Sequence, residues 1–197
     1  MMPRLVSRSK RLPAFFLMAF LACLGLAASL APAGAQEWKV NKAKSRVSFQ
    51  LSMDGQPVEA QFGSFKIEMR FDPEEPGDGE ITAILDAASL RTGDAARDAA
   101  LASADWLDAA SHPAIRFTSV NIKETDSGRY RMDANLTVKG VTKRVAIPLA
   151  IDEEAGGGNV QAQLRVSRSA FGIGPAGGGS DENVSIVLDL AATHLTN

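Results

Sequence analysis

The chain has 197 residues, with 21 basic and 23 acidic side chains and one cysteine, Cys23. Beyond the first 35 residues, 17 basic and 23 acidic residues remain and no cysteine, which gives this part a net charge of −6. The acid excess disfavours nucleic-acid binding, which needs a basic face. The lack of cysteine excludes a disulfide scaffold, thiol catalysis and a cysteine-ligated zinc site in this part of the chain.

The start of the chain has the pattern of a secretory signal peptide. Basic residues precede an apolar run over residues 14–30, and Ala33-Gly34-Ala35 supplies small residues for cleavage. A membrane anchor is the alternative, because a run of this length is near the shortest that spans a bilayer. We predict that residues 1–35 are a signal peptide, and that residues 36–197 form one domain that works in the periplasm.

Short apolar segments then recur along the chain, and most of them alternate apolar and polar residues with a period of two. In chain order they are residues 47–51, 65–71, 81–85, 115–122, 130–138, 145–151, 160–166 and 184–190. This pattern is typical of half-buried β-strands. The turns between them are rich in glycine, proline and aspartate, which favours antiparallel pairing of neighbours. The interrupted alternation at Phe62-Gly63-Ser64-Phe65 predicts a bulge that bends one strand.

One segment has a different pattern. Residues Asp94–Leu107 are rich in alanine, and Thr92 or Asp94 can cap the start of a helix there. About eight antiparallel strands with one apolar face can close into a barrel or stack as a sandwich, and the periodicity does not separate the two. An eight-stranded barrel is either packed by its own side chains or holds one ligand.

Residues suited to catalysis or metal binding are scarce. The two histidines, His112 and His194, have no metal-ligand spacing, so we expect them at surface or capping positions. The stretch 172–177 matches a dinucleotide-binding fingerprint, but a strand instead of a helix is predicted to follow it, so we interpret it as a hairpin loop. We therefore predict no catalytic residue and no metal, and a hydrolase or metal-dependent enzyme is the disfavoured alternative.

Several motifs, in this order, resemble the YceI-like family. They are Ser45-Arg46-Val47-Ser48-Phe49, Phe62-Gly63-Ser64-Phe65, Ala88-Ser89-Leu90-Arg91-Thr92-Gly93, Arg97-Asp98, Asp105-Trp106-Leu107-Asp108, His112-Pro113-Ala114-Ile115-Arg116-Phe117, Asn135-Leu136-Thr137-Val138-Lys139-Gly140-Val141-Thr142-Lys143 and Ser167-Arg168-Ser169-Ala170-Phe171-Gly172-Ile173. The combination of Leu-Thr-Val-Lys-Gly-Val-Thr-Lys with a downstream Arg-x-x-Phe-Gly is specific, and the resemblance covers nearly all of residues 36–197.

This resemblance implies an all-β fold: an eight-stranded antiparallel lipocalin-like barrel with one helix near the barrel opening. It also implies a cavity for a long isoprenoid or related lipid, secretion to the periplasm, and no enzymatic activity. Many relatives carry a histidine within the segments that are Asn41–Ser45 and Arg97–Leu101 here, so a head-group or metal role of those histidines does not carry over. The variant with Trp106 resembles the branch associated with membrane cytochrome b561, which makes a quinone such as ubiquinone a candidate ligand.

We predict that a set of apolar residues lines a hollow barrel and its helical lid. They are Phe49, Leu51, Phe65, Ile67, Phe117, Met132, Leu136, Leu164, Phe171 and Ile186 in the barrel, and Leu101, Trp106 and Leu107 in the lid. The expected function is to sequester and carry an isoprenoid-type lipid. The alternative is a packed barrel that acts through its surface on a cytochrome b561 partner. The sequence leaves the oligomeric state open between a monomer and a homodimer.

Overall fold

The structure is a computed structural model that describes residues 35–53, 55–175 and 181–195. Apart from Ala35, the predicted signal peptide lies outside these residues. None of the helices in the described part of the chain is long and apolar enough to cross a membrane.

Strands make up most of the described chain, as the alternation predicts. Their bounds are β1 (Gln36–Val40), β2 (Arg46–Met53), β3 (Gln56–Phe62), β4 (Phe65–Phe71), β5 (Glu80–Asp86), β6 (Leu90–Arg91), β7 (Ala114–Asp126), β8 (Arg129–Val138), β9 (Val141–Glu154), β10 (Gly157–Ser167) and β11 (Asn183–His194). The helices are α1 (Ala95–Ala102) and the short 3-10 helices η1 (Lys42–Lys44), η2 (Pro76–Asp78), η3 (Ala87–Ser89) and η4 (Ser169–Phe171).

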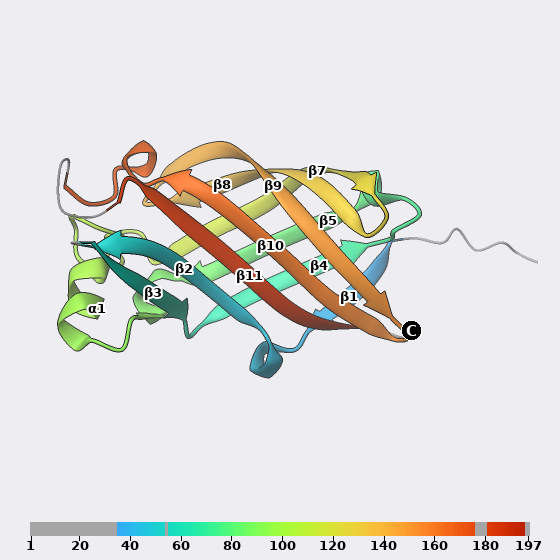
Figure 1. The fold of residues 1–197 in the computed structure, drawn as a ribbon, viewed down its shortest axis with the longest axis horizontal. Helices are drawn as coiled ribbons and strands as arrows, with labels where there is room; N and C mark the ends of the chain where they lie inside the picture. Colours follow the sequence, from blue (N-terminus) through green and yellow to red (C-terminus); the bar gives the residue numbers. More distant parts are fainter. Residues whose placement is uncertain (1–34, 54, 176–180, 196–197) are drawn as a thin grey trace, which may run out of the picture. The chain divides into compact units, whose positions relative to one another are not determined.

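The strands form a closed, eight-stranded antiparallel barrel. Of the two arrangements that the periodicity allows, the fold is therefore the barrel and not the sandwich. The ring runs β1, β4, β5, β7, β8, β9, β10, β11, and β11 pairs with β1 to close it. β11 also pairs with β2, so β1 and β2 are two halves of one strand interrupted by η1. β3 and β6 extend β4 and β5 in the same way, because β3 pairs with β2 and with β6. Figure 1 shows α1 at one end of the barrel with β2 and β3, and the end of β11 at the other.

The chain bends at the predicted place, the corner between β3 and β4, but it does so between two strands and not as a bulge within one. β3 ends at Phe62 and β4 begins at Phe65, and the two residues between them belong to neither strand. The Gly63 amide donates to the carbonyl oxygen of Ser89 at 3.0 Å, and the Asp86 amide donates to that of Ser64 at 3.0 Å. The bend therefore keeps its backbone groups hydrogen-bonded while the chain passes from one half of the strand to the other.

The end of the barrel opposite α1 is closed by packed aromatic and aliphatic side chains. Phe71 and Ile122 are fully buried, and the Tyr130 ring packs edge-on against Phe71 with 5.0 Å between ring centroids. The indole Nε1 of Trp38 donates to the carbonyl oxygen of Phe71 at 3.1 Å. Burial, with smaller effects of Glu124 and Glu153, raises the pKa of Tyr130, so its phenol is neutral at neutral pH.

The helix is shorter than the alanine-rich segment predicts. Asp94 caps its start, because the Asp94 carboxylate accepts from the Arg97 amide at 2.9 Å. The helix ends at Ala102, where the Ser103 hydroxyl donates to the carbonyl oxygen of Ala100 at 2.7 Å. A serine that bonds back to the last turn competes with a further helical turn, so the prediction that the helix reaches Leu107 is wrong.

Close strand approach at Gly157 gives a first testable prediction. A Cβ atom at Gly157 would collide with the carbonyl oxygen of Ala192 on β11, whereas one at Gly77 would meet nothing. We expect Gly157→Ala to lower the free energy of unfolding by roughly 1 to 3 kcal/mol, as overpacking does. Gly77→Ala is the matched control and should stay within about 0.5 kcal/mol of the parent in urea unfolding. Equal stability of the two variants would contradict the prediction.

Candidate functional site

An apolar cavity runs inside the barrel from the lid residues Leu101 and Trp106 to Met69, Val160 and Leu190 near the packed end. It has a volume of about 140 Å³, and side chains from most strands and from the lid line it. Among the described residues that line it, Arg168 alone carries a charge. Apolar cavities of this kind stay dry and take apolar molecules.

The structure brings most of the predicted lining residues together around this cavity. The predicted residues that line it are Phe49, Leu51, Ile67, Leu101, Trp106, Leu107, Phe117, Met132, Leu136, Leu164, Phe171 and Ile186. Phe65 does not line the cavity; it is buried in the core beside the corner between β3 and β4. Binding of a ligand by these side chains remains a prediction.

The lid consists of α1 and the loop that follows it. Leu101 is 2% exposed, and its carbonyl oxygen accepts from the Leu107 amide at 3.0 Å. The carbonyl oxygen of Ala102 accepts from the Ala109 amide, also at 3.0 Å. These bonds fold the loop back on the helix, so that Leu101, Trp106 and Leu107 all border the cavity.

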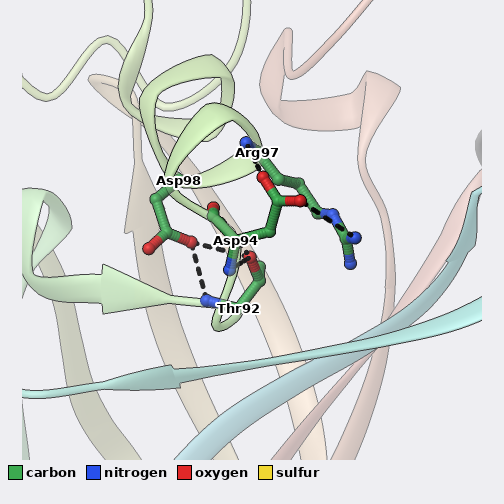
Figure 2. Close-up of polar contacts among 4 residues, drawn as sticks. All are labelled: Thr92, Asp94, Arg97 and Asp98. Atoms are coloured by element: carbon green, nitrogen blue, oxygen red, sulfur yellow. Dashed lines mark hydrogen bonds and ion pairs between the residues drawn. The ribbon is translucent and has the colours of Figure 1, made fainter.

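Four polar residues hold the start of α1 (Figure 2). Asp98 accepts from the amide and the hydroxyl of Thr92, both at 2.7 Å. Neighbouring residues on a helix do not face each other, and Arg97 accordingly points away from Asp98. The Arg97 guanidinium lies 3.9 Å from the Asp94 carboxylate. One half-buried carboxylate therefore ties the helix to Thr92, the residue that follows β6.

The Asp98 carboxylate predicts how the lid responds to pH. The two hydrogen bonds from Thr92 lower the pKa of Asp98, with smaller effects of Arg91 and Arg97. A carboxylate whose pKa is lower in the folded state stabilises it above the unfolded pKa of about 3.9, and loses this effect as pH falls through the folded pKa. The anchor is thus intact at neutral pH and weakens only below about pH 4.

We expect Asp98→Ala to raise the amide exchange rates of α1 several-fold at pH 7, because the Thr92 bonds are lost. Hydrogen exchange with mass spectrometry measures this. Asp105→Ala, in the loop after the helix, is the matched control and should leave α1 unchanged. If exchange in α1 does not respond to Asp98→Ala, the carboxylate does not anchor the helix.

The residue-by-residue prediction missed several lining residues, among them Val47, Phe62 and Leu149, and Arg168 is the charged one. It is 4% exposed, and its guanidinium lies 5.8 Å from the centroid of the Trp106 ring. Its Nε donates to the carbonyl oxygen of Asp181 at 3.0 Å, and its Nη1 donates to those of Ile173 at 2.8 Å and Pro175 at 3.2 Å. Arg168 thereby joins the lid to the loop after β10. Arg168 is the arginine of the Arg-x-x-Phe-Gly motif, so the sequence does mark the position. Its burial could not be predicted, because arginine is mostly exposed in proteins.

The turn between β8 and β9 touches the loops on both sides of it. Lys139 and Gly140 have positive φ angles of 49° and 76°, the conformation of a tight hairpin turn. The Lys139 ammonium donates to the carbonyl oxygen of Gly172 at 2.9 Å. The His112 ring lies against Gly140, where an added Cβ would be 2.9 Å from His112 Cε1. This turn therefore supports the loops that border the cavity.

The two histidines differ from each other in environment. His112 Nε2 lies 3.9 Å from the Asp108 carboxylate, and the side chain is 39% exposed, in keeping with a surface position. His194 was expected at the surface but its side chain is 14% exposed. It packs edge-on against Trp38 at 4.3 Å and lies 3.3 Å from the Glu153 carboxylate. The pairing of β11 with β1 buries the His194 side chain. The described residues contain no group of side chains suited to binding a metal ion.

A family model described as the YceI-like domain matches residues 38–192. The chain belongs to the YceI-like family. This confirms the resemblance drawn from the motifs. Among YceI-like relatives, a UPF0312 protein of Vibrio parahaemolyticus is 30% identical over 142 residues, which cover 68% of this chain and 73% of that protein. A UPF0312 protein of Azotobacter vinelandii is 32% identical over 133 residues, 64% of this chain and 69% of that protein.

Solved structures share the fold of this YceI-like chain. BcnA of Burkholderia cenocepacia superposes with a TM-score of 0.76 at 29% identity, over 79% of this chain and 100% of BcnA. A polyisoprenoid binding domain from Saccharophagus degradans superposes with a TM-score of 0.63 at 14% identity, over 80% of this chain and 98% of that domain. The second likeness shows a common barrel and nothing finer.

Proposed function

We propose that this YceI-like protein binds a long isoprenoid-type lipid, a polyprenoid or a quinone, inside its barrel and serves as its carrier or reservoir. The observation that carries the proposal is the cavity, whose lining is apolar apart from Arg168. The hydrogen bonds from Arg168 to three main-chain carbonyls give its charge a structural role. A neutral hydrocarbon chain matches such a site, and a charged metabolite does not.

Hydrophobic burial is strong enough to hold such a chain. Each buried CH₂ contributes about 0.8 kcal/mol, so one five-carbon isoprene unit contributes roughly 4 kcal/mol before costs. The loss of rigid-body and chain freedom offsets a large part of this sum. A few units therefore suffice for useful affinity without a charged anchor. The Saccharophagus degradans domain, which shares the fold, is a polyisoprenoid binding domain and supports the same class of ligand.

We place this function in the periplasm. The support is the pattern of basic, apolar and small residues over 1–35, which predicts export and cleavage before Gln36. Intact-mass measurement of protein from a periplasmic extract tests this, with a mature chain that begins at Gln36 as the expected result. A full-length chain in the membrane fraction would instead support the anchor.

Native mass spectrometry and organic extraction of protein purified from its own host test the ligand. We expect a bound species with the mass of a quinone or a polyprenol that is released by solvent. Titration with prenols of increasing length should show affinity that rises with the first isoprene units and then levels off, because the cavity is finite. A ligand-free mass together with no uptake of ubiquinone or polyprenols would contradict the proposal.

A further inference from the structure

The barrel wall is incomplete between β9 and β10. Their ladder runs from Gly157 opposite Glu154 to Ala162 opposite Leu149 and stops there. Beyond this point, residues 141–148 of β9 pair with β8 alone, and residues 163–167 of β10 pair with β11 alone. The two strands are thus joined at the packed end of the barrel and unpaired at the end that faces α1. We call this unpaired stretch the β9–β10 split.

The sequence contains a cause for the split. Pro148 occupies the first position on β9 after the last ladder pair, and it is exposed on the outer face. Proline has no amide hydrogen to donate, and in sheets it is confined to edges and bulges. Pro148 therefore favours the end of the β9–β10 ladder at Leu149.

η4 bridges the ends of the two strands at the open end of this split. It follows β10 after Arg168, and the next residue, Gly172, accepts a hydrogen bond from Lys139 in the turn before β9. Phe171 of η4 is 3% exposed and lines the cavity together with Leu164 and Val166 of β10. At this place a packed phenyl ring borders the cavity where the ladder between β9 and β10 has ended.

η4 is held firmly on the β10 side of the split and weakly on the β9 side. On the β10 side, the hydroxyls of Ser167 and Ser169 donate to the Glu182 carboxylate, and the Ile173 amide donates to the carbonyl oxygen of Arg168. On the β9 side, η4 is joined by the Lys139 bond, which is solvent-exposed. One exposed hydrogen bond contributes about 1 kcal/mol net, so the contact between η4 and β9 opens at a low cost.

We propose that the lipid enters and leaves through the β9–β10 split, with Phe171 as the plug that turns aside. This inference rests on the proposed function and adds the route to the site. A chain that slides in sideways between two strands need not unfold the lid. The route also fits a long flexible lipid, because the split runs along the strands and its unpaired residues border the cavity.

Stopped-flow quenching of Trp106 fluorescence by a short-chain ubiquinone tests the route, since Trp106 lines the cavity. Phe171→Ala should speed both uptake and release by about tenfold, because it lowers a barrier that both directions cross; this corresponds to about 1.4 kcal/mol. Asp98→Ala loosens the helical lid without removing a lining residue, and should leave uptake and release unchanged.

Pro148→Thr should have the opposite effect to Phe171→Ala, and it lies on the outer face, where it does not contact the lipid. It restores an amide donor, so the ladder should extend, with slower amide exchange at residues 145–147 and 163–166. Uptake and release should both slow several-fold at nearly constant affinity. Gln161→Thr, an exposed position within the paired stretch, is the matched control and should change neither rate.

The outcomes separate the two proposals. Faster uptake in Asp98→Ala, with parental uptake in Phe171→Ala, would overturn the route and place the entrance at the lid. If Pro148→Thr does not extend the ladder, Phe171→Ala still decides the route. No quenching of Trp106 in the parent, together with a ligand-free native mass, would overturn the proposed function itself.

Discussion

Arg168→Ala is expected to lower the free energy of unfolding by about 3 kcal/mol, the typical loss when one member of a buried polar network is removed. The carbonyl oxygens of Ile173, Pro175 and Asp181 lose their donor, and the Trp106 ring loses the cation above it. Urea unfolding followed by circular dichroism measures the effect. Arg168→Lys should rescue little of it, because one ammonium group cannot reproduce the planar fork of a guanidinium.

A neighbouring arginine supplies the control. Arg165 lies on β10 three residues before Arg168, and its side chain is exposed, so Arg165→Ala should change stability by less than about 0.5 kcal/mol. If both alanine variants unfold at the same urea concentration, the contacts of Arg168 do not stabilise the lid. Loss of ligand in Arg168→Ala at unchanged stability would instead indicate a direct contact with the lipid.

Leu136→Trp is expected to weaken lipid binding by at least about 100-fold, equivalent to about 2.7 kcal/mol. Leu136 is 4% exposed and lines the cavity, so an indole at this position occupies the space that the lipid needs. Extra volume inside a closed barrel also costs roughly 1 to 3 kcal/mol of stability. Fluorescence titration with ubiquinone measures binding, and thermal unfolding shows whether the barrel still folds.

Asn135→Trp is the matched control, because its side chain is exposed on the adjacent position of β8. It adds the same indole to the outer face and should leave binding within about twofold of the parent. Undiminished binding in Leu136→Trp would show that the lipid does not occupy the barrel. Co-purification with a membrane cytochrome b561 that persists in this variant would favour a function of the outer surface.

Local patterns in the sequence predict most of the strands but not all. The long strands β8 and β10 have unbroken alternation, because one of their faces is buried along the whole length. β1, β3 and β6 were not predicted. β6 has two residues, and β3 buries only Val58, Ala60 and Phe62 among polar neighbours, a weak periodic signal. Pairing with β2 stabilises β3, and this partner is not visible in a local window.

The candidate site shows the same limit. Alternation identifies the inward face of a strand, so it predicts Met132, Leu136 and Leu164 as lining residues. It does not tell how far along the barrel a residue lies, and Phe65 is inward-facing and buried without reaching the cavity. The burial of Arg168 and His194 depends on carbonyls and rings contributed by distant segments.

The sequence by itself determined the class of the molecule: an acidic, cysteine-free domain after residue 35, with β-strands that each bury one face, and motifs of the YceI-like family. These properties follow from residue type and spacing, because burial of one face repeats every second residue. Only the tertiary structure decided where the cavity lies, which end of the barrel is packed, and that β9 and β10 separate beyond Leu149. Those features depend on strand register and on contacts between residues far apart in the chain, which local periodicity does not contain.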